Sequence, residues 1–338
     1  MRQRYETIPR YVPHAVKGHA LNQNESQYEL PERIQDKIRS IDLTGLSRYP
    51  VEELIRLKQR YAEYAGVEAN QLMVGSGSDE LLAILCQALL DVDDVVVAPL
   101  PDFSMYGIYA HIARGNFVQP DEDGLSFQSL VQTIEENHPK LVLVSNPNNP
   151  TGKMWTLDEL AMVAERVPYL VVDEAYIDFT MDDSFKPRLA DHRNVIILRT
   201  LSKAFGLANL RIGFMIADPA LIENIDRFRS PFNVSGLSAA VAAVVLEDVA
   251  YIRDAVAYHN EQREKLKPLL APVGKILPSR ANFLYVVTRD SEAWASRFLA
   301  NGVHVRAFSD GIRVSAGTDE AYRLIQQTIE EVSSLENS

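Results

Sequence analysis

The sequence has little cysteine and no excess of positive charge. Its single cysteine, Cys86, stands in the apolar run ELLAILCQALL, so no disulfide can form within the chain and no cysteine cluster offers a metal site. There are 46 Asp and Glu residues against 34 Lys and Arg, giving a net charge of -12 over 338 residues. Such an acidic chain argues against a surface for nucleic acid or an anionic membrane, although local basic pockets for small anions are still allowed.

Long hydrophobic segments are absent as well. The N-terminus, MRQRYETIPR, lacks the apolar segment of a signal peptide. The longest weakly polar run, residues 234–246, is interrupted by serines and is too short to span a bilayer. Hydrophobic residues make up 46% and charged residues 24%, which is typical of globular proteins. The sequence therefore predicts a soluble, cytoplasmic protein whose length allows more than one domain.

Short apolar runs alternate with helical segments from about residue 50. The runs DVVVAP, LVLVSN, YLVVDEAY and NVIILRT are apolar throughout, as in strands buried on both faces. The helical segments between most of them indicate a mainly parallel sheet flanked by helices. RIGFMIA predicts a further strand, which we expect to be antiparallel because its connection is short.

The pattern changes after residues 235–269, which predict one long helical stretch. The runs NFLYVVT, VHVRAF and IRVSAG then predict short strands with helices to one side, as in a smaller α+β domain. The first forty or so residues have no strand pattern, and we expect them to pack against this second domain.

Two glycine-containing turns follow predicted strands, at positions where open α/β sheets bind ligands. In GSGSDELL, residues 75–82, backbone amides at the start of a helix suit an anion such as phosphate. Asp79 is alternatively a simple helix cap, and a lone GxG is weak evidence. In SNPNNPTG, residues 145–152, a rigid turn would hold the Asn149 amide over the sheet edge.

An acid and an amine follow two further strands. In VVDEAYIDF, Asp173 ends an apolar strand and Tyr176 follows it, and a structural ion pair is the competing explanation for a buried acid there. In RTLSKAFGLANLRIG, Lys203 is either a surface lysine or a buried amine with a lowered pKa that can attack a carbonyl. The same loop carries hydroxyls and a guanidinium, which together with the amine suit a ligand that has both an aldehyde and a phosphate.

In this order, the motifs SNPNNPTG, VVDEAY and RTLSKAFGLANLRIG resemble the fold-type I pyridoxal-phosphate (PLP) aminotransferases, and more closely the histidinol-phosphate aminotransferase family. The resemblance extends through LNQNES, RYPVEEL, GSGSDE, SPFNVSGLSAAVA, RANFLYV and IRVSAGT. It implies a large domain with a mainly parallel seven-stranded sheet flanked by helices, and a smaller α+β domain. It places an N-terminal arm and part of the small domain at residues 1–45, the large PLP-binding domain at 46–255 and the C-terminal small domain at 256–338.

The resemblance also implies roles around the cofactor. Lys203 attaches PLP and then acts as general acid and base, and Asp173 keeps the ring nitrogen protonated. Tyr176 and Asn149 hydrogen-bond the phenolic oxygen, and Phe103 takes a ring-stacking position that often holds tyrosine. The phosphate ligands are Arg211, Ser202, Thr200 and the backbone of Ser78 and Asp79.

The remaining implied residues concern the partner subunit and the substrate. Tyr49 matches a tyrosine that reaches the cofactor phosphate of the neighbouring subunit in a homodimer with shared sites, with a core aromatic as the alternative. Arg313 matches an arginine that binds a substrate carboxylate or phosphate, and Arg306 matches a second arginine for the substrate phosphate. A tight hairpin would bring both to one pocket. Asn24 matches an asparagine near the substrate.

The implied reaction transfers an amino group from a small-molecule donor, histidinol phosphate, to the keto acid 2-oxoglutarate. One alternative is an aminotransferase for aromatic or other amino acids. Another is a PLP decarboxylase of the phosphothreonine type. A third is a cofactor-binding protein without turnover, which the complete set of Lys203, Asp173 and Tyr176 disfavours.

Overall fold

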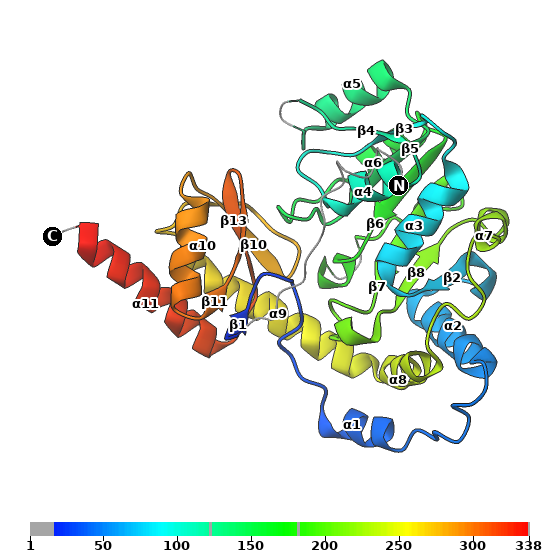
Figure 1. The fold of residues 1–338 in the computed structure, drawn as a ribbon, viewed down its shortest axis with the longest axis horizontal. Coiled ribbons are helices and arrows are strands. Elements are labelled where there is room, and N and C mark those ends of the chain that lie inside the picture. Colours follow the sequence, from blue (N-terminus) through cyan, green and yellow to red (C-terminus); the bar gives the residue numbers. More distant parts are fainter. Residues whose placement is uncertain (1–16, 122–123, 181–182, 337–338) are drawn as a thin grey trace, which may run out of the picture.

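The computed structural model describes residues 17–121, 124–180 and 183–336, and the chain forms a larger and a smaller lobe (Figure 1). Residues 1–16 of the predicted arm lie outside the described residues. The strands of the larger lobe are β2 (Leu72–Gly75), β3 (Val95–Val97), β4 (Asn116–Val118), β5 (Leu141–Ser145), β6 (Tyr169–Asp173), β7 (Val195–Thr200) and β8 (Gly213–Ile216). Its helices are α2 (Val51–Ala65), α3 (Gly77–Leu89), α4 (Met105–Ile112), α5 (Phe127–Asn137), α6 (Leu157–Ala164), α7 (Pro219–Asp226) and α8 (Gly236–Leu246).

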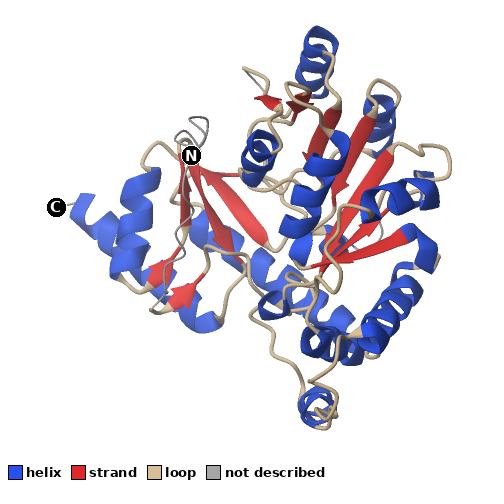
Figure 2. Ribbon diagram, turned by 45° about the vertical axis from the view of Figure 1, so that its right-hand side comes forward, coloured by secondary structure: helices blue, strands red, loops and turns tan. Residues whose placement is uncertain are grey.

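These seven strands form one sheet in the order β2-β8-β7-β6-β5-β3-β4. Neighbouring strands from β7 to β4 run parallel, whereas β8 is antiparallel to both β7 and β2. Helices cover both faces of the sheet (Figure 2). The predicted mainly parallel seven-stranded sheet is confirmed, and so is the antiparallel strand predicted at RIGFMIA.

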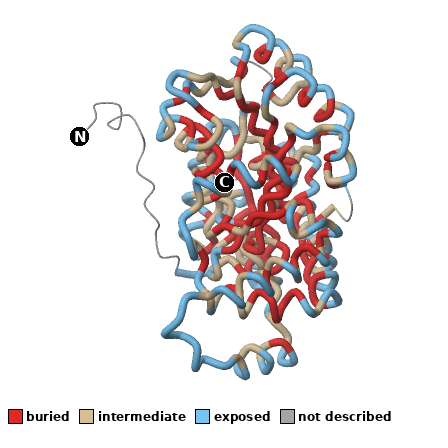
Figure 3. Tube along the Cα trace, turned by 90° about the vertical axis from the view of Figure 1, so that its right-hand side faces the viewer, coloured by how far each residue is buried: buried red, intermediate tan, exposed pale blue. Residues whose placement is uncertain are grey.

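The central strands are apolar on both faces because each face supports its own part of the core. In β5, Leu141 and Leu143 pack in one apolar cluster with Leu85 of α3, whereas Val142 and Val144 pack in a second cluster. Successive side chains of a strand point to opposite faces, so one continuous apolar run serves both clusters. Figure 3 shows the buried residues concentrated in the middle of the molecule.

The carboxyl ends of three parallel strands meet at one edge of this sheet. Ser145 of β5 is opposite Asp173 of β6, which in turn is opposite Leu198 of β7. The end of β7 leads directly into the loop that carries Lys203. Strand register therefore brings together motifs that lie far apart in the sequence.

The helical stretch predicted at residues 235–269 is two helices, α8 and α9 (Val249–Leu270). The break lies at Asp248, whose carboxylate accepts a hydrogen bond from the Tyr251 amide at 3.0 Å and so caps α9. A short acidic side chain binds the free backbone amides at the start of a helix, so Asp248 favours the start of a new helix at this position. Helix α9 joins the two lobes, and the predicted domain boundary at 255/256 falls inside it (Figure 1).

The smaller lobe carries an antiparallel sheet in the order β12-β13-β10-β9. Its strands are β9 (Lys275–Ile276), β10 (Phe283–Val287), β12 (Arg306–Phe308) and β13 (Gly311–Ser315), and its helices are α10 (Ser291–Ala300) and α11 (Asp319–Glu336). Leu284, Ile312 and Val314 of the sheet pack in one cluster with Phe298 of α10 and Ile325 of α11. Because side chains alternate along a strand, Arg313 belongs to the opposite face.

The N-terminal arm contacts both lobes. Strand β1 (His19–Ala20) pairs in parallel with β11 (Val303–His304) of the smaller lobe. This strand departs from the expectation of no strand pattern, because two residues are too few to show an alternation in the sequence. Helix α1 (Glu32–Arg39) instead lies near the larger lobe, where Arg33 forms an ion pair with Asp248 at 2.7 Å.

Candidate active site

The carboxyl ends of β5, β6 and β7 and the start of α3 surround one pocket. The pocket is lined by Ser145, Ala175 and ten residues predicted from the sequence: Ser78, Asp79, Phe103, Asn149, Asp173, Tyr176, Thr200, Ser202, Lys203 and Arg211. Parallel strands present their carboxyl ends at the same edge, which explains why these separate motifs converge. Tyr49, Asn24, Arg306 and Arg313 do not line this pocket.

The Lys203 amine lies at the pocket beneath the N-terminal arm. Its Nζ donates a hydrogen bond to the carbonyl oxygen of Gln23 at 2.9 Å and lies 5.8 Å from the ring centroid of Tyr176. The residue is half-buried. The sequence left open a surface lysine or a buried amine, and the exposure of Lys203 lies between these two alternatives.

Asp173 is a buried acid whose hydrogen-bond donors are neutral. The Tyr106 hydroxyl donates to Oδ2 at 2.9 Å, and the Ala175 amide donates to Oδ1 at 3.1 Å. Within the described ranges, no lysine or arginine forms an ion pair with it. Burial raises the pKa of Asp173 to about 6, from an ordinary value of 3.8, and the two hydrogen bonds only partly offset this effect. Its negative charge is therefore available to a positively charged ligand.

The structural ion pair considered for Asp173 belongs to the next residue, Glu174. Glu174 is fully buried and accepts a hydrogen bond from Arg199 Nε at 2.7 Å, and Arg199 also lies 3.3 Å from Asp178. Sequence reasoning missed this pair because its two members are distant in the chain. Strand alternation directs the neighbouring acids to different surroundings, so one acid is neutralised and the other faces the pocket.

The arm and the smaller lobe supply further contacts beside the pocket. Asn24 is buried, and its Nδ2 donates to the Tyr176 hydroxyl at 2.9 Å. Arg313 is also buried and donates to Asn149 Oδ1 and, at 2.7 Å, to the Asn22 carbonyl oxygen. Asn24 and Arg313 thus touch two of the residues that line the pocket, although they stand outside its lining.

Arg306 and Arg313 are directly opposite each other on β12 and β13. The expected tight hairpin therefore exists, and cross-strand neighbours project to the same face of a sheet. Their surroundings differ, because Arg306 is exposed whereas Arg313 is 7% exposed and bound to the arm.

The start of α3 and the loop after β7 form a cradle of donors. Arg211 lies 3.2 Å from Asp79 and 3.4 Å from the Ser202 hydroxyl. Gly77 has a φ of 80°, and a Cβ there would lie 2.6 Å from the Arg211 guanidinium. A Cβ at Gly213 would lie 2.6 Å from the Ser78 nitrogen. A side chain at either glycine would block the approach of Arg211 and of β8 to the start of α3. A helix N-terminus beside an arginine suits a phosphate.

Two predicted aromatic residues have different surroundings. Phe103 lines the pocket and makes an edge-to-face contact with Tyr106, with ring centroids 5.5 Å apart. Tyr49 is 75% exposed and stacks on Phe232 at 4.6 Å. The alternative that Tyr49 is a core aromatic is therefore wrong.

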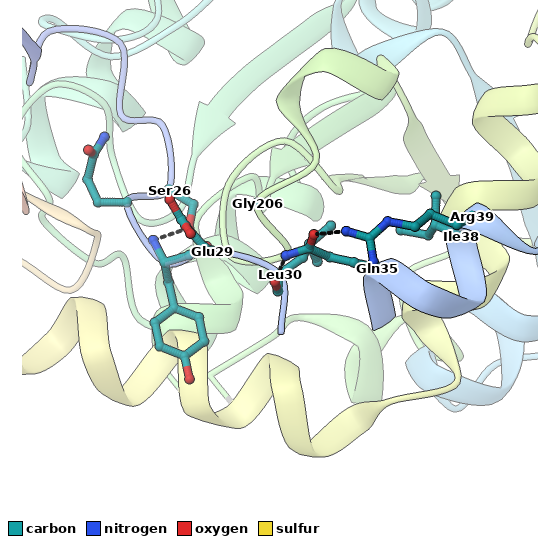
Figure 4. A pocket seen from close by; sticks show the side chains of 9 residues that line it. Ser26, Glu29, Leu30, Gln35, Ile38, Arg39 and Gly206 are labelled. Carbon is teal, nitrogen blue, oxygen red and sulfur yellow. Dashed lines mark hydrogen bonds between the residues drawn. The ribbon is translucent and has the colours of Figure 1, made fainter. Parts of the chain in front are cut away.

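A wider pocket of about 590 Å³ lies beneath the arm (Figure 4). Its wall consists of residues 26–30, three residues of α1 and Gly206. Within this wider pocket, the Arg39 side chain donates a hydrogen bond to the Gln35 side chain at 3.0 Å. Lys203 and Asp173 line the other pocket, at the carboxyl ends of the strands. Pocket volume alone therefore does not locate the chemistry. In the described part of the chain, no cluster of metal-binding side chains occurs and no helix has the length and apolar character needed to cross a bilayer.

Comparison with known proteins identifies the family. The family model described as aminotransferase class I and II matches residues 17–329. The chain belongs to this family. Membership confirms the resemblance predicted from the motifs, the aminotransferase class of the enzyme and the fold.

Individual aminotransferases are similar over nearly the whole chain. A histidinol-phosphate aminotransferase of Ruminiclostridium cellulolyticum is 34% identical over 325 residues, covering 91% of this chain and 90% of the relative. The crystal structure of histidinol-phosphate aminotransferase from Sinorhizobium meliloti, in complex with pyridoxal-5'-phosphate, superposes with a TM-score of 0.87 at 24% identity, covering 98% of both chains. L-threonine-O-3-phosphate decarboxylase from Porphyromonas gingivalis gives a TM-score of 0.79 at 17% identity, covering 93% of this chain and 99% of that chain. At these identities the two structures show the fold alone.

The Asp173→Asn substitution should stabilise the ligand-free aminotransferase at pH 8 and leave its stability unchanged near pH 4. The folded-state pKa of about 6 exceeds the ordinary 3.8, so the carboxyl group lowers stability as the pH rises through this interval. Asparagine carries no charge, and its amide can accept from Ala175 and donate to the Tyr106 hydroxyl. We expect the melting temperature to rise by about 2 °C at pH 8, measured by calorimetry.

Glu174→Gln is the matched control, because it removes one partner of a buried ion pair. It should lower the melting temperature at both pH values. A melting-temperature difference for Asp173→Asn that is the same at pH 4 and pH 8 would contradict the role of burial at Asp173.

Proposed function

We propose that this protein is a PLP-dependent aminotransferase that transfers an amino group between histidinol phosphate and 2-oxoglutarate, in histidine biosynthesis. The observation that carries the proposal is the pocket in which an amine, a buried carboxylate and a helix N-terminus meet. Relatives named histidinol-phosphate aminotransferase, at 32–34% identity over about nine-tenths of the chain, support this donor.

The residues of the pocket fit PLP. The ring nitrogen, when protonated, supplies the positive charge that the described partners of Asp173 lack. The close approach at Gly77 and Gly213 leaves the amides at the start of α3 and the Arg211 guanidinium to bind phosphate. Lys203 offers the amine that an aldehyde requires.

Bound PLP supplies an electron-withdrawing ring that stabilises negative charge on the substrate carbon bearing the amino group. Lys203 holds the cofactor and moves a proton at that carbon. Asp173 keeps the ring nitrogen protonated. Tyr176 and Asn149 orient the ring through its phenolic oxygen, and Phe103 covers a face of the ring.

The other residues bind the two anionic ends of the ligands. The cofactor phosphate is held by Arg211, Ser202, Thr200 and the backbone of Ser78 and Asp79. Arg306 and Arg313 form a paired site for the substrate phosphate, which the carboxylates of glutamate also use. A guanidinium offers several donors in a fixed fork and so suits both anions. Asn24 completes this end of the site through its hydrogen bond to Tyr176.

The fold does not choose between transamination and decarboxylation, since a decarboxylase of phosphothreonine is also similar in structure. The decisive experiment mixes holoenzyme separately with histidinol phosphate, phenylalanine and phosphothreonine. The absorbance change of the cofactor reports amino transfer, and released CO₂ reports decarboxylation. Histidinol phosphate should give the fastest absorbance change without CO₂, and CO₂ release from phosphothreonine would contradict the proposed reaction.

We also propose a homodimer with shared sites. Tyr49 is exposed together with Leu43 and Leu46 of the same segment, and it stacks on the exposed Phe232. Contiguous exposed apolar side chains of this kind mark an interface. Tyr49 would then reach the cofactor phosphate of the second subunit.

Two further statements stay predictions from the sequence. One is the division of the chain at residues 1–45, 46–255 and 256–338, and the other is the cytoplasmic location.

Lys203→Ala should lower turnover by at least about 10³-fold, because Lys203 is the only amine among the described residues that line the pocket. Binding of pyridoxine 5'-phosphate, which has no aldehyde, should change far less. Lys275→Ala is the control, since Lys275 is exposed on β9. Turnover by steady-state kinetics and affinity by calorimetry test both expectations, and full turnover of Lys203→Ala would refute the assignment.

Arg306→Ala should reduce the ratio of kcat/KM for histidinol phosphate to that for phenylalanine by about 10- to 100-fold. The reason is the loss of charge-assisted hydrogen bonds to the phosphate, which are worth about 1.5–3 kcal/mol. Arg289→Ala is the matched control, because Arg289 is exposed beyond the end of β10. An unchanged ratio, or a wild type that prefers phenylalanine, would favour an aromatic aminotransferase.

Leu46→Asp should weaken the dimer by at least about tenfold, because a charge would be buried against a second chain. Sedimentation velocity over a range of concentrations measures the change. Val92→Asp is the control, since Val92 is 54% exposed just before β3 and outside the proposed interface. A wild type that sediments as a monomer at all concentrations would exclude the shared sites.

A further inference from the structure

His259, in the middle of helix α9, is a fully buried histidine that the sequence motifs did not single out. Its Nδ1 lies 2.6 Å from the carbonyl oxygen of Ala255, one turn earlier in the same helix. Its Nε2 lies 3.2 Å from the backbone amide nitrogen of Gln27. Because Gln27 belongs to the N-terminal arm, the imidazole joins the arm to the helix that connects the two lobes (Figure 1).

These two contacts determine where the imidazole carries its proton. A carbonyl oxygen only accepts hydrogen bonds, so the hydrogen must be on Nδ1, which faces Ala255. A backbone amide only donates, so Nε2 must present its lone pair to Gln27. Only the neutral imidazole meets both needs. A second proton, on Nε2, would face the hydrogen of the Gln27 amide and break this contact, so the position of the arm depends on the charge of His259.

The surroundings of the imidazole disfavour that second proton. The ring of Phe179, from the short 3₁₀ helix η3 (Ile177–Thr180), contacts it edge to face with centroids 5.7 Å apart, and the ring of Tyr258 does so at 5.3 Å. Burial lowers the pKa of His259 below its ordinary 6.5, and the hydrogen bond to Ala255 offsets this effect only in part. At pH 7 the ring is therefore neutral and able to hold the arm.

The charged and titratable groups of the elements around the imidazole do not supply it with a counter-charge. Asp178 of η3 accepts from a tyrosine and an arginine of the larger lobe. Arg263 of α9 donates to a backbone carbonyl at 2.7 Å, and the hydroxyl of Tyr322 of α11 does so at 2.9 Å. The arm carries Glu25 and Glu29, and in the described part of the chain neither acid forms an ion pair with the ring. A protonated ring would therefore lack a partner there.

Helix α9 also holds the loop that carries Lys203. The hydroxyl of Tyr251, eight residues before His259, donates to the carbonyl oxygen of Phe205 at 3.2 Å. The same Tyr251 ring stacks on Tyr28 of the arm, with centroids 5.9 Å apart. The helix thus fixes the arm and the lysine loop relative to each other.

The arm segment bound at the imidazole is the one that contacts the active site. Gln27 follows directly on residues 22–26, and three contacts with the site come from residues 22–24. Their backbone carbonyls accept from Lys203 at 2.9 Å and from Arg313 at 2.7 Å, and an asparagine side chain donates to Tyr176 at 2.9 Å. Release of the arm at Gln27 would loosen all three contacts.

We propose that neutral His259 holds residues 22–28 of the arm over Lys203 and thereby sets the affinity of the site for its amino donor. His259 is a positioning residue, because it acts through the arm. Protonation of the ring releases the arm and weakens donor binding. This proposal rests on the proposed function, in which the donor binds between the arm and Lys203.

Hydrogen exchange of the Gln27 amide in the ligand-free protein tests the contact without any turnover. The protection factor of this amide, measured by NMR, should be high at pH 8 and fall at least about tenfold as the His259 ring signal titrates on acidification. His259→Gln should keep the protection at every pH, because its Oε1 can accept from the amide and gains no proton. Protection that stays constant while the ring titrates, or a ring that stays neutral until the protein unfolds, would overturn the proposal.

Kinetics of the holoenzyme with histidinol phosphate test the effect on the donor. At pH 8, His259→Leu should raise KM about tenfold and keep kcat within about threefold, because the arm contributes to binding. His259→Gln should restore KM to within about threefold of the wild type, and its KM should rise less than that of the wild type on acidification. His111→Leu is the matched control, since His111 bonds the Gly107 carbonyl of its own helix in the same way but is exposed on α4.

An unchanged KM in His259→Leu, or a loss confined to kcat, would refute the positioning role. If His259→Leu does not fold, two substitutions in the arm replace it. Gln27→Pro removes the amide hydrogen that bonds the ring, whereas Gln27→Ala keeps it. KM should rise about tenfold in the proline variant only, and equal KM values in the two variants would contradict the proposal.

The outcome separates this proposal from the proposed function. A holoenzyme that uses phenylalanine and not histidinol phosphate would refute the proposed donor. The KM for phenylalanine in Gln27→Pro and Gln27→Ala would then decide the role of His259, and the exchange of the Gln27 amide decides the contact in either case.

Discussion

The burial of Asp173 without a cation is the constraint on which the rest of the site depends. A carboxylate enclosed by a sheet and its helices is unfavourable unless an opposite charge reaches it. Glu174, one residue later, meets the same problem with Arg199, and that pair is complete within the chain. Asp173 has only neutral donors among its described partners, so the fold retains a charge that a cationic ring can neutralise. The buried charge of Asp173 therefore lowers the stability of the ligand-free fold at the place where the ligand is proposed to bind.

The sheet determines where that charge is available. Parallel register places Ser145 opposite Asp173, and the next strand leads to Lys203. The proposed phosphate site lies on the other side of the same edge, where Gly213 allows β8 to approach the start of α3. In the proposed site, rigid strands and a helix terminus would hold the ring end and the phosphate end of one ligand at a constant separation.

The N-terminal arm and the smaller lobe complete the site from outside the sheet. Gln23 accepts from Lys203, Asn24 donates to Tyr176, and Arg313 joins the Asn22 carbonyl to Asn149. Polar groups buried at such a junction must satisfy one another, which links the position of the arm to the geometry of the pocket. In the proposed function, substrate recognition would therefore be coupled to the packing of the two lobes.

The sequence by itself determined the alternation of buried strands and helices, and with it the parallel sheet and the strand ends that carry Asn149, Asp173 and Lys203. These features follow from local patterns, because apolar runs and turn residues act over a few neighbouring positions. The tertiary structure alone decided that Glu174 has a cation whereas Asp173 has none among its described partners, and that Tyr49 is exposed. Such partners are distant in the chain, and strand register and lobe packing, which no local pattern encodes, bring them together.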